Sequence, residues 1–393
     1  MAGETVLILG GGWGGLTAAH RLRGLLPDEH RIVVVERSET FELCLSNMWL
    51  MTGEKLSVSE VQRKMSNLRR SGIEWVHADA TGFDPKTRTV DTNVGPLVGD
   101  HVVIALGAEL APEGIPGFAD AAHNLYEAQG AADLGGLLAT FDKGSIAVLV
   151  AGAPFRCPAA PYEAAMLTDG LLRRRGVRDH VDIALYTPEA APMGVAGAAV
   201  GQALVDMLDD REISYFPQHQ VSSIDPRSRS ISFDERTVAY DLLVGIPPHR
   251  APKIVVEAGL TDETGYVPVH PQTLELVSDS EKLETQYPNV HAIGDVTAIR
   301  LMNAMLLPKA GVFAEAHAEV VAAAIAARVL GDPKPTGFDG AGFCYVETGD
   351  GLAAYGSGDF YAYPAPRVKL EPPTTEARLA KGEYEQLLDN WFN

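Results

Sequence analysis

The sequence predicts an α/β fold in which two strand–helix–strand units follow one another, the first domain being split around the second, with a β-rich lobe at the C-terminal end. A short apolar run leads into a glycine loop at residues 5–15, as at the start of a βαβ unit. The same order of elements recurs at residues 145–186. Residues 336–393 are rich in Gly, Pro and aromatics, which favours strands and turns there.

Length and charge restrict the class of protein. At roughly 150 residues per domain, 393 residues correspond to two or three domains. Lys plus Arg number 32 and Asp plus Glu 52, so the formal charge of -20 repels nucleic acid and anionic lipid headgroups. We therefore expect no nucleic-acid partner.

The N-terminal residues and the cysteines indicate the compartment. The start MAGETVLILGG has no basic region before its apolar run, so we interpret it as a strand and not as a signal peptide. No apolar run reaches the ~18 residues of a membrane span. Three cysteines cannot staple a secreted fold of this length. We expect a soluble cytoplasmic protein without a metal site, since no metal-type pairing of His or Cys occurs.

The first unit carries a dinucleotide-binding motif. Thr5–Leu9 is a predicted strand, Gly10, Gly12 and Gly15 form GxGxxG, a helix follows at residues 16–26, and Arg31–Glu36 is a second strand. Glu36 lies 21 residues after Gly15, where an acid binds a ribose hydroxyl. Helix N-terminal amides then bind the phosphates. The motif predicts an adenine dinucleotide site; the alternative is a tight turn that merely needs glycine.

The second unit has a different loop. Strands are expected at 145–151 and Val181–Tyr186, with a helix at 162–175, but the loop between the first strand and the helix reads GAPFRCPAAP. Pro154, Pro158 and Pro161 remove backbone donors and fix φ, so this unit is expected to have lost NAD(P)H binding. A strand at 241–245 is expected to start the return to the first domain. The predicted boundaries are 1–110 and 251–335 for the two parts of the first domain, 111–250 for the second, and 336–393 for the C-terminal lobe and tail.

Two later segments complete the prediction. A strand over residues 289–295 ends in Gly294-Asp295, which places a carboxylate over a ribityl or ribose hydroxyl. Pro308 to Gly311 open a long apolar helix that ends near Leu330, before Gly331 and Pro333. The tail then carries an apolar helical face, which packs on the body of the protein or touches a bilayer surface; its members are Tyr384, Leu387, Leu388, Trp391 and Phe392.

Six segments together resemble one family. GGGWGG with Glu36, the turn at Gly107, PFRCPAAPYE, IGD, PKAG and CYVETGDG are similar to the sulfide:quinone oxidoreductases and the flavoprotein subunit of flavocytochrome c sulfide dehydrogenase. The resemblance implies two Rossmann-like dinucleotide-binding domains, with FAD in the first. It also implies oxidation of sulfide to sulfur or polysulfide at a cysteine pair beside the flavin, with electrons passed to a quinone.

The resemblance assigns residues to the cofactor. Asp295 would hold the ribityl chain, and Lys309 would face the pyrimidine end of the flavin, where a cation stabilises the charge of the reduced ring. The alternative for Lys309 is a solvated residue at a helix start. The ADP half of FAD would be held by Gly10, Gly12, Gly15 and Glu36, and the turn at Gly107 would also contact the cofactor.

The resemblance also assigns the chemistry to cysteines. Cys157 and Cys344, 187 residues apart, would form the redox-active pair, against the alternative of two buried thiols. Glu163 would accept a proton near the sulfide site, or would only stabilise a helix N-terminus. Cys44 would bind FAD covalently, as in the flavocytochrome branch, or would be a plain buried thiol.

The acceptor and the class of activity have alternatives. Cys44, and the absence of a third cysteine from residues 123–128, favour a cytochrome or another small redox protein as acceptor instead of a quinone. An NAD(P)H-dependent flavin reductase needs an intact second glycine loop. A redox-responsive flavoprotein without turnover is the non-enzymatic alternative. A quinone acceptor implies peripheral contact with the inner face of the membrane, through the C-terminal tail.

Overall fold

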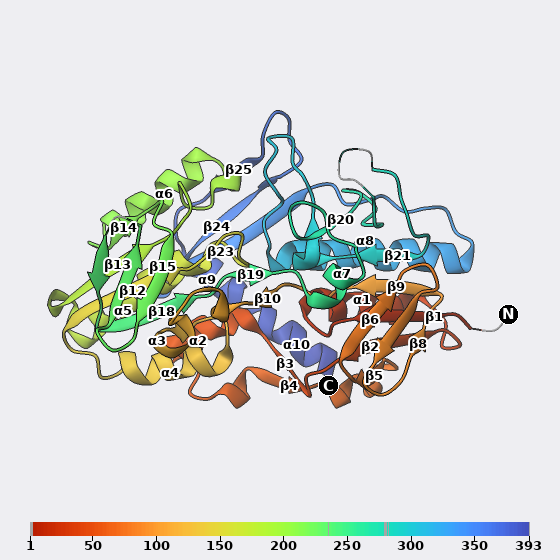
Figure 1. The fold of residues 1–393 in the computed structure, drawn as a ribbon, viewed down its shortest axis with the longest axis horizontal. Coiled ribbons are helices and arrows are strands. Elements are labelled where there is room, and N and C mark those ends of the chain that lie inside the picture. Colours follow the sequence, from red (N-terminus) through yellow and green to blue (C-terminus); the bar gives the residue numbers. More distant parts are fainter. Residues whose placement is uncertain (1–2, 235, 279–280, 282, 393) are drawn as a thin grey trace.

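The computed structural model describes residues 3–234, 236–278, 281 and 283–392, and it contains two lobes that each enclose a parallel sheet (Figure 1). The sheet of the first lobe has the order β21-β9-β1-β2-β5, and all its neighbours are parallel. Its strands are β1 (Thr5–Leu9), β2 (Arg31–Glu36), β5 (Glu74–His77), β9 (His101–Ile104) and β21 (Val290–Ala292). The split predicted for the first domain is therefore present in this sheet, because β21 comes from beyond the second lobe.

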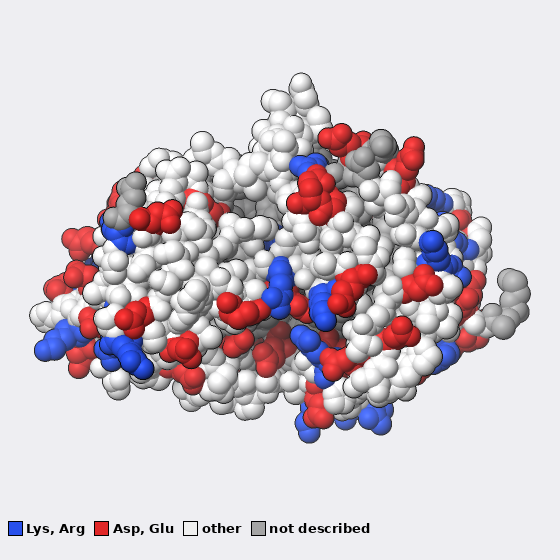
Figure 2. Space-filling model, viewed as in Figure 1, with Lys and Arg blue, Asp and Glu red and all other residues white. Residues whose placement is uncertain are grey.

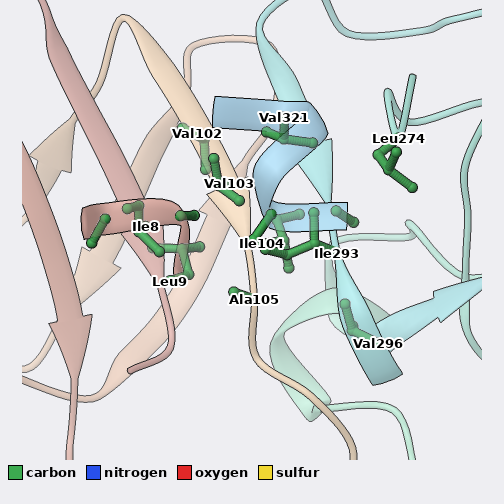
Figure 3. Close-up of a cluster of buried hydrophobic side chains, with 14 of the residues drawn as sticks. Ile8, Leu9, Val102, Val103, Ile104, Ala105, Leu274, Ile293, Val296 and Val321 are labelled. Atoms are coloured by element: carbon green, nitrogen blue, oxygen red, sulfur yellow. The ribbon is translucent and has the colours of Figure 1, made fainter. Parts of the chain in front are cut away.

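Helices α1 (Trp13–Leu25) and α8 (Gly311–Leu330) pack against each other beside this sheet. Helix α1 begins at Trp13, before the predicted residue 16, because Gly12 already serves as its N-cap. Side chains from β1, β9 and α8 meet in a continuous apolar core, in which Ile8, Ile104 and Val321 are fully buried (Figure 3). Burial of apolar runs on both faces is the arrangement expected of parallel strands.

The second lobe contains a sheet of order β11-β18-β12-β13-β14. Its strands are β11 (His123–Asn124), β12 (Gly144–Val150), β13 (Val181–Tyr186), β14 (Ser214–Phe216) and β18 (Leu242–Ile246). The prediction that residues 241–245 start the return to the first domain was wrong, because β18 pairs with β12 inside this sheet. The longer helices of this lobe are α4 (Ala128–Leu138), α5 (Ala160–Arg175) and α6 (Ala198–Asp209).

Smaller elements complete the two lobes. Two three-stranded antiparallel sheets are β6 (Ala80–Asp84), β7 (Thr89–Thr92) and β8 (Leu97–Val98), and β15 (Val221–Asp225), β16 (Ser230–Phe233) and β17 (Thr237–Ala239). Paired short strands are β3 (Thr40–Glu42) with β4 (Gln62–Lys64), β10 (Glu109–Leu110) with β19 (His249–Arg250), and β20 (Val267–Pro268) with β22 (Thr297–Ala298). The short helices are α2 (Asn47–Met51), α3 (Phe118–Ala121) and α7 (Lys253–Glu257).

The C-terminal lobe connects the two halves of the molecule. Its antiparallel strands are β23 (Ala341–Gly349), β24 (Leu352–Asp359) and β25 (Arg367–Leu370), followed by α9 (Thr375–Gly382) and α10 (Tyr384–Phe392). Strand β23 packs on α5 of the second lobe. Helix α10 lies between the lobes in Figure 1. The β-rich lobe is therefore as predicted, and it brings Cys344 towards the second domain.

The apolar face of the tail packs on the first lobe. Leu388 and Phe392 are buried, and the ring of Trp391 lies 4.8 Å from that of Trp13, centroid to centroid. Leu387 points outward and is 41% exposed. The tail thus packs on the body of the protein, as one of the two alternatives predicted. Acidic side chains are scattered over the face shown in Figure 2, as the charge of -20 leads one to expect.

Candidate functional site

A cavity of about 970 Å³ lies where the first sheet, the second lobe and the C-terminal helices meet. This volume is near the upper end of the range for small-molecule and cofactor sites. Its lining includes the residues that follow β1, β2, β9 and β21. The cavity therefore lies outside the carboxyl ends of parallel strands, where α/β folds bind their ligands.

The glycine loop lines the cavity and has the geometry of a phosphate-binding turn. Gly10 has a φ of +100°, a conformation that favours glycine. A Cβ on Gly15 would lie 2.0 Å from the carbonyl oxygen of Gly10, so the close approach of helix to strand requires glycine there. A Cβ on Gly12 would meet no atom within 4 Å, and no side chain caps α1. The first amides of α1 are therefore available to a pyrophosphate.

Glu36 and Gly107 complete this half of the cavity. The Glu36 carboxylate accepts hydrogen bonds of 2.8 Å from the amides of Gly11 and Ser38, which fix it at the cavity wall. Gly107 has a φ of +65° and also lines the cavity, with open space on its Cβ side. Backbone amides, a helix N-terminus and a fixed carboxylate form the donor and acceptor set that suits the ADP half of FAD.

Asp295 lines the cavity beyond the glycine loop, in a short 3-10 turn three residues after the end of β21. Within the described part of the chain its carboxylate accepts no hydrogen bond, which leaves both oxygens for a hydroxyl-bearing ligand. Burial raises the pKa of Asp295, whereas the charges of Lys309 and Arg156 lower it. The position fits a ribityl chain.

Lys309 directly precedes Ala310 and Gly311, which line the cavity. Its ammonium donates to the carbonyl oxygen of Asp295 at 2.5 Å and lies 3.3 Å from the ring centroid of Tyr266. Burial lowers the pKa of Lys309 to about 8. Lys309 is buried, so the alternative of a solvated residue was wrong; its ammonium supports the turn that carries Asp295, and its position beside the flavin stays a prediction.

Cys157 and Cys344 line the same cavity, from the loop before α5 and from β23. The structure contains both as free thiols. Cys157 has a φ of +52°, and burial raises the pKa of its thiol to about 12. Burial and the neighbouring Cys157 also raise the pKa of Cys344. The two thiols thus share one enclosed environment, in which a thiolate needs a compensating cation.

Cys44 lies on another part of the cavity wall, in a short 3-10 turn after β3. Its side chain is exposed, so the alternative of a plain buried thiol was wrong. An exposed thiol on the wall is accessible to a ligand in the cavity.

Glu163 is buried in the first turn of α5 and lines the cavity beside the cysteines. Its Oε1 lies 2.5 Å from Nζ of Lys381 and accepts a hydrogen bond of 2.8 Å from the amide of Glu347. Burial raises the pKa of Glu163, and the Lys381 charge opposes that rise. Glu163 therefore does more than stabilise a helix N-terminus.

Sequence reasoning missed Lys381, Glu347 and Arg378. Lys381 lines the cavity, and Arg378 precedes it by three residues on α9, so both side chains lie on one helix face. Two basic residues at this spacing, in a strongly acidic chain, are the signal that sequence analysis had available. Their partners on α5 and β23 are set only by tertiary folding.

The comparisons with known proteins agree with this architecture. Residues 4–318 match the family model described as pyridine nucleotide-disulphide oxidoreductase. The mitochondrial sulfide:quinone oxidoreductase of Mus musculus is 26% identical over 308 residues, a match covering 74% of this chain and 65% of that protein, just under two thirds of its length. The sulfide-quinone reductase of Aquifex aeolicus is 25% identical over 383 residues, covering 93% and 85%.

A solved structure supports the fold. The X-ray structure of the Aquifex aeolicus sulfide:quinone oxidoreductase superposes with a TM-score of 0.84 at 23% identity, covering 98% of this chain and 90% of that one. The family model covers both parallel-sheet lobes and the cavity residues up to α8. The chain therefore belongs to the pyridine nucleotide-disulphide oxidoreductase family.

Proposed function

We propose that this chain is an FAD-dependent oxidoreductase that oxidises sulfide to sulfur or polysulfide and passes the electrons to a quinone. One observation carries the proposal: Cys157 and Cys344, remote in sequence, line the same cavity as the glycine loop and Asp295. Relatives named sulfide:quinone oxidoreductase support the choice of substrate and acceptor.

The cysteines perform the first step. Hydrosulfide attacks one sulfur of an oxidised Cys157–Cys344 disulfide, so that a new S–S bond forms a persulfide and the electron pair of the broken bond leaves as the thiolate of the other cysteine. Glu163, whose pKa is raised by burial, takes the proton when hydrogen sulfide enters as the neutral molecule. Two soft nucleophiles in an enclosed site suit this chemistry.

The cofactor side rests on the first lobe. FAD bound in this cavity would supply the two-electron acceptor for the sulfur centre. The glycine loop and Glu36 would hold its ADP half, and Asp295 its ribityl chain. Cys44, exposed on the cavity wall, would attach the flavin covalently.

The tail would bring the quinone to the cavity. Tyr384 of α10 and Phe343 of β23 line the cavity and offer aromatic faces to a planar quinone ring. In the described part of the chain no helix is long and apolar enough to cross a membrane. We propose peripheral contact with the inner face of the membrane, made by outward residues of the C-terminal helices, Leu379 (65% exposed) and Leu387.

A second candidate keeps the sulfide reaction and passes electrons to a cytochrome or another small redox protein. The exposed Cys44 on the cavity wall favours it, because covalent flavin attachment at this position belongs to the flavocytochrome branch of the resemblance. An NAD(P)H-dependent reductase is disfavoured by the proline-containing loop before α5. A redox-responsive flavoprotein without turnover predicts no reduction of the flavin by sulfide.

Anaerobic titration of the purified flavoprotein with sulfide tests the proposal. We expect loss of the oxidised-flavin absorbance at about one equivalent, and its return on addition of decylubiquinone. Cytochrome c is the competing acceptor: reoxidation by cytochrome alone supports the second candidate. A flavin that sulfide leaves oxidised, or that NADH reduces rapidly, contradicts the proposal.

A further inference from the structure

A buried cluster of charged side chains joins helix α9 to the cysteine site. Nζ of Lys381 lies 2.5 Å from Oε1 of Glu163 and 3.0 Å from Oε1 of Glu347. All three side chains are at least nine-tenths buried. Burial of so many charges is costly unless each is paired, and such clusters are often found at functional sites.

Arg378 anchors the outer side of this cluster. Its Nε lies 2.7 Å from Oε2 of Glu347, and its Nη2 lies 2.5 Å from Oε2 of Glu54 at the surface. The indole of Trp49 donates a 3.0 Å hydrogen bond to Oε1 of Glu347, and the Arg378 guanidinium lies over the Trp49 ring. The two oxygens of Glu347 thus each have a cation beside them, Arg378 at Oε2 and Lys381 at Oε1, while Lys381 also pairs with Glu163.

The thiols meet few other charges. Besides burial, the charge of Glu163 on α5 raises the pKa of Cys157, whereas the charges of Lys381 on α9 and of Arg156 in its own loop lower it. Besides burial, Cys157 and Glu163 raise the pKa of Cys344, whereas the charge of Lys381 lowers it. Two neutral phenols also face the pair, Tyr126 beside Cys157 and Tyr384 beside Cys344. Lys381 lines the same cavity as both thiols, and its charge lowers the pKa of each.

We propose that Lys381 is a positioning residue for the cysteine pair: held by Glu347 and Arg378, it supplies the positive charge that compensates a thiolate on either Cys157 or Cys344. Glu163 opposes it, since its carboxylate disfavours a thiolate until it takes a proton. The Lys381–Glu163 pair thus couples proton uptake by Glu163 to thiolate formation. This inference rests on the proposed function, because it assigns the pair to thiolate chemistry.

The test measures the thiols alone. The holoprotein is reduced with dithiothreitol, and the rate of iodoacetamide alkylation at the Cys157 and Cys344 peptides is followed by mass spectrometry from pH 6 to 10. At pH 8 we expect Lys381→Met to slow alkylation about tenfold, with the profile moved to higher pH. Lys381→Arg should restore most of the rate, and Glu163→Gln should accelerate it.

The opposite signs separate charge from structure. Loosened packing would accelerate alkylation in both Lys381→Met and Glu163→Gln, and that result overturns the inference, as does an unchanged rate in Lys381→Met. Lys55→Met is the matched control, because Lys55 pairs with Glu385 of α10 at 2.9 Å and does not line the cavity. Should Lys381→Met fail to fold, an unchanged rate in Glu163→Gln overturns the inference. No sulfide or quinone is used, so failure of the proposed function leaves this result independent.

Discussion

The backbone amide of Cys157 donates a hydrogen bond of 2.7 Å to the carbonyl oxygen of Lys309. This bond joins the second lobe to the segment that enters α8 of the first, and the adjacent Arg156 forms a parallel bridge with the same lysine. Lys309 in turn donates to the carbonyl of Asp295. The position of the cysteine is therefore fixed relative to the cofactor half of the cavity by one main-chain hydrogen bond and by the Lys309 side chain, whose ammonium reaches the turn that carries Asp295.

Removal of either cavity cysteine should abolish the sulfide reaction without loss of cofactor. We expect Cys157→Ser and Cys344→Ser to slow flavin reduction by sulfide at least roughly a hundredfold, because a hydroxyl cannot form a persulfide. Stopped-flow absorbance checks this, with FAD content measured beside it. Near-normal reduction in both variants would contradict a role for the pair.

Gly15 and Gly24 offer a matched test of the glycine loop within one helix. A Cβ on Gly15 would lie 2.0 Å from the Gly10 carbonyl oxygen, whereas a Cβ on Gly24 meets nothing within 4 Å. We expect Gly15→Ala to lower FAD content and the melting temperature, and Gly24→Ala to stabilise by about 0.5–1 kcal/mol through helix propensity. Thermal unfolding and flavin absorbance measure both effects. Equal behaviour of the two variants would argue against the close approach.

Covalent attachment of the flavin is tested at Cys44. Acid precipitation of the protein should leave the yellow colour in the pellet, with a flavin mass on the Cys44 peptide. In Cys44→Ser the flavin should pass to the supernatant. Colour released from the unsubstituted protein would show that the exposed thiol is not bound to the flavin.

Buried histidines should make the fold sensitive to acid. Burial lowers the pKa of His291 to about 3, against an ordinary value of 6.5. Between about pH 6.5 and 3, His291 therefore binds a proton in the unfolded chain but stays neutral in the folded chain. Its contribution to stability is present above about pH 6.5 and is lost as the pH falls towards 3, at about 1.4 kcal/mol per pH unit.

Thermal unfolding against pH measures this effect. His291→Gln should make the decline of melting temperature between pH 6.5 and 4 shallower, by the contribution of one proton. His77→Gln is the control, because His77 is exposed. The same slope in His291→Gln and in the unsubstituted protein would place the acid sensitivity on other groups.

Local patterns were sufficient for much of the fold. The strands Thr5–Leu9 and Arg31–Glu36 were predicted with their observed bounds, because both faces of a parallel strand are buried and the apolar run has no other explanation. Gly10 and Gly15 were predictable because a positive φ at the first and the close approach of helix to strand at the second exclude a side chain. Cys157, Cys344 and Glu163 were predicted from a resemblance, and the structure brings them to one cavity.

The remaining features depend on tertiary contacts. Lys309 is buried because two carbonyl oxygens and the Tyr266 ring bind its ammonium, and none of these is adjacent in sequence. Strand β18 joins the second sheet through its register with β12, which its apolar composition does not specify. Lys381 was missed because its partners lie on α5 and β23, and its burial follows from their packing.

Lys381 and Tyr384, on α9 and α10, line the same cavity as residues 10–14. During synthesis the glycine loop leaves the ribosome before the segment that carries α9 and α10. The glycine loop can fold early, but α9 and α10 can close the cavity only after residue 384 has been synthesised. Flavin that binds such a nascent chain would therefore meet an open cleft, which α9 and α10 close later.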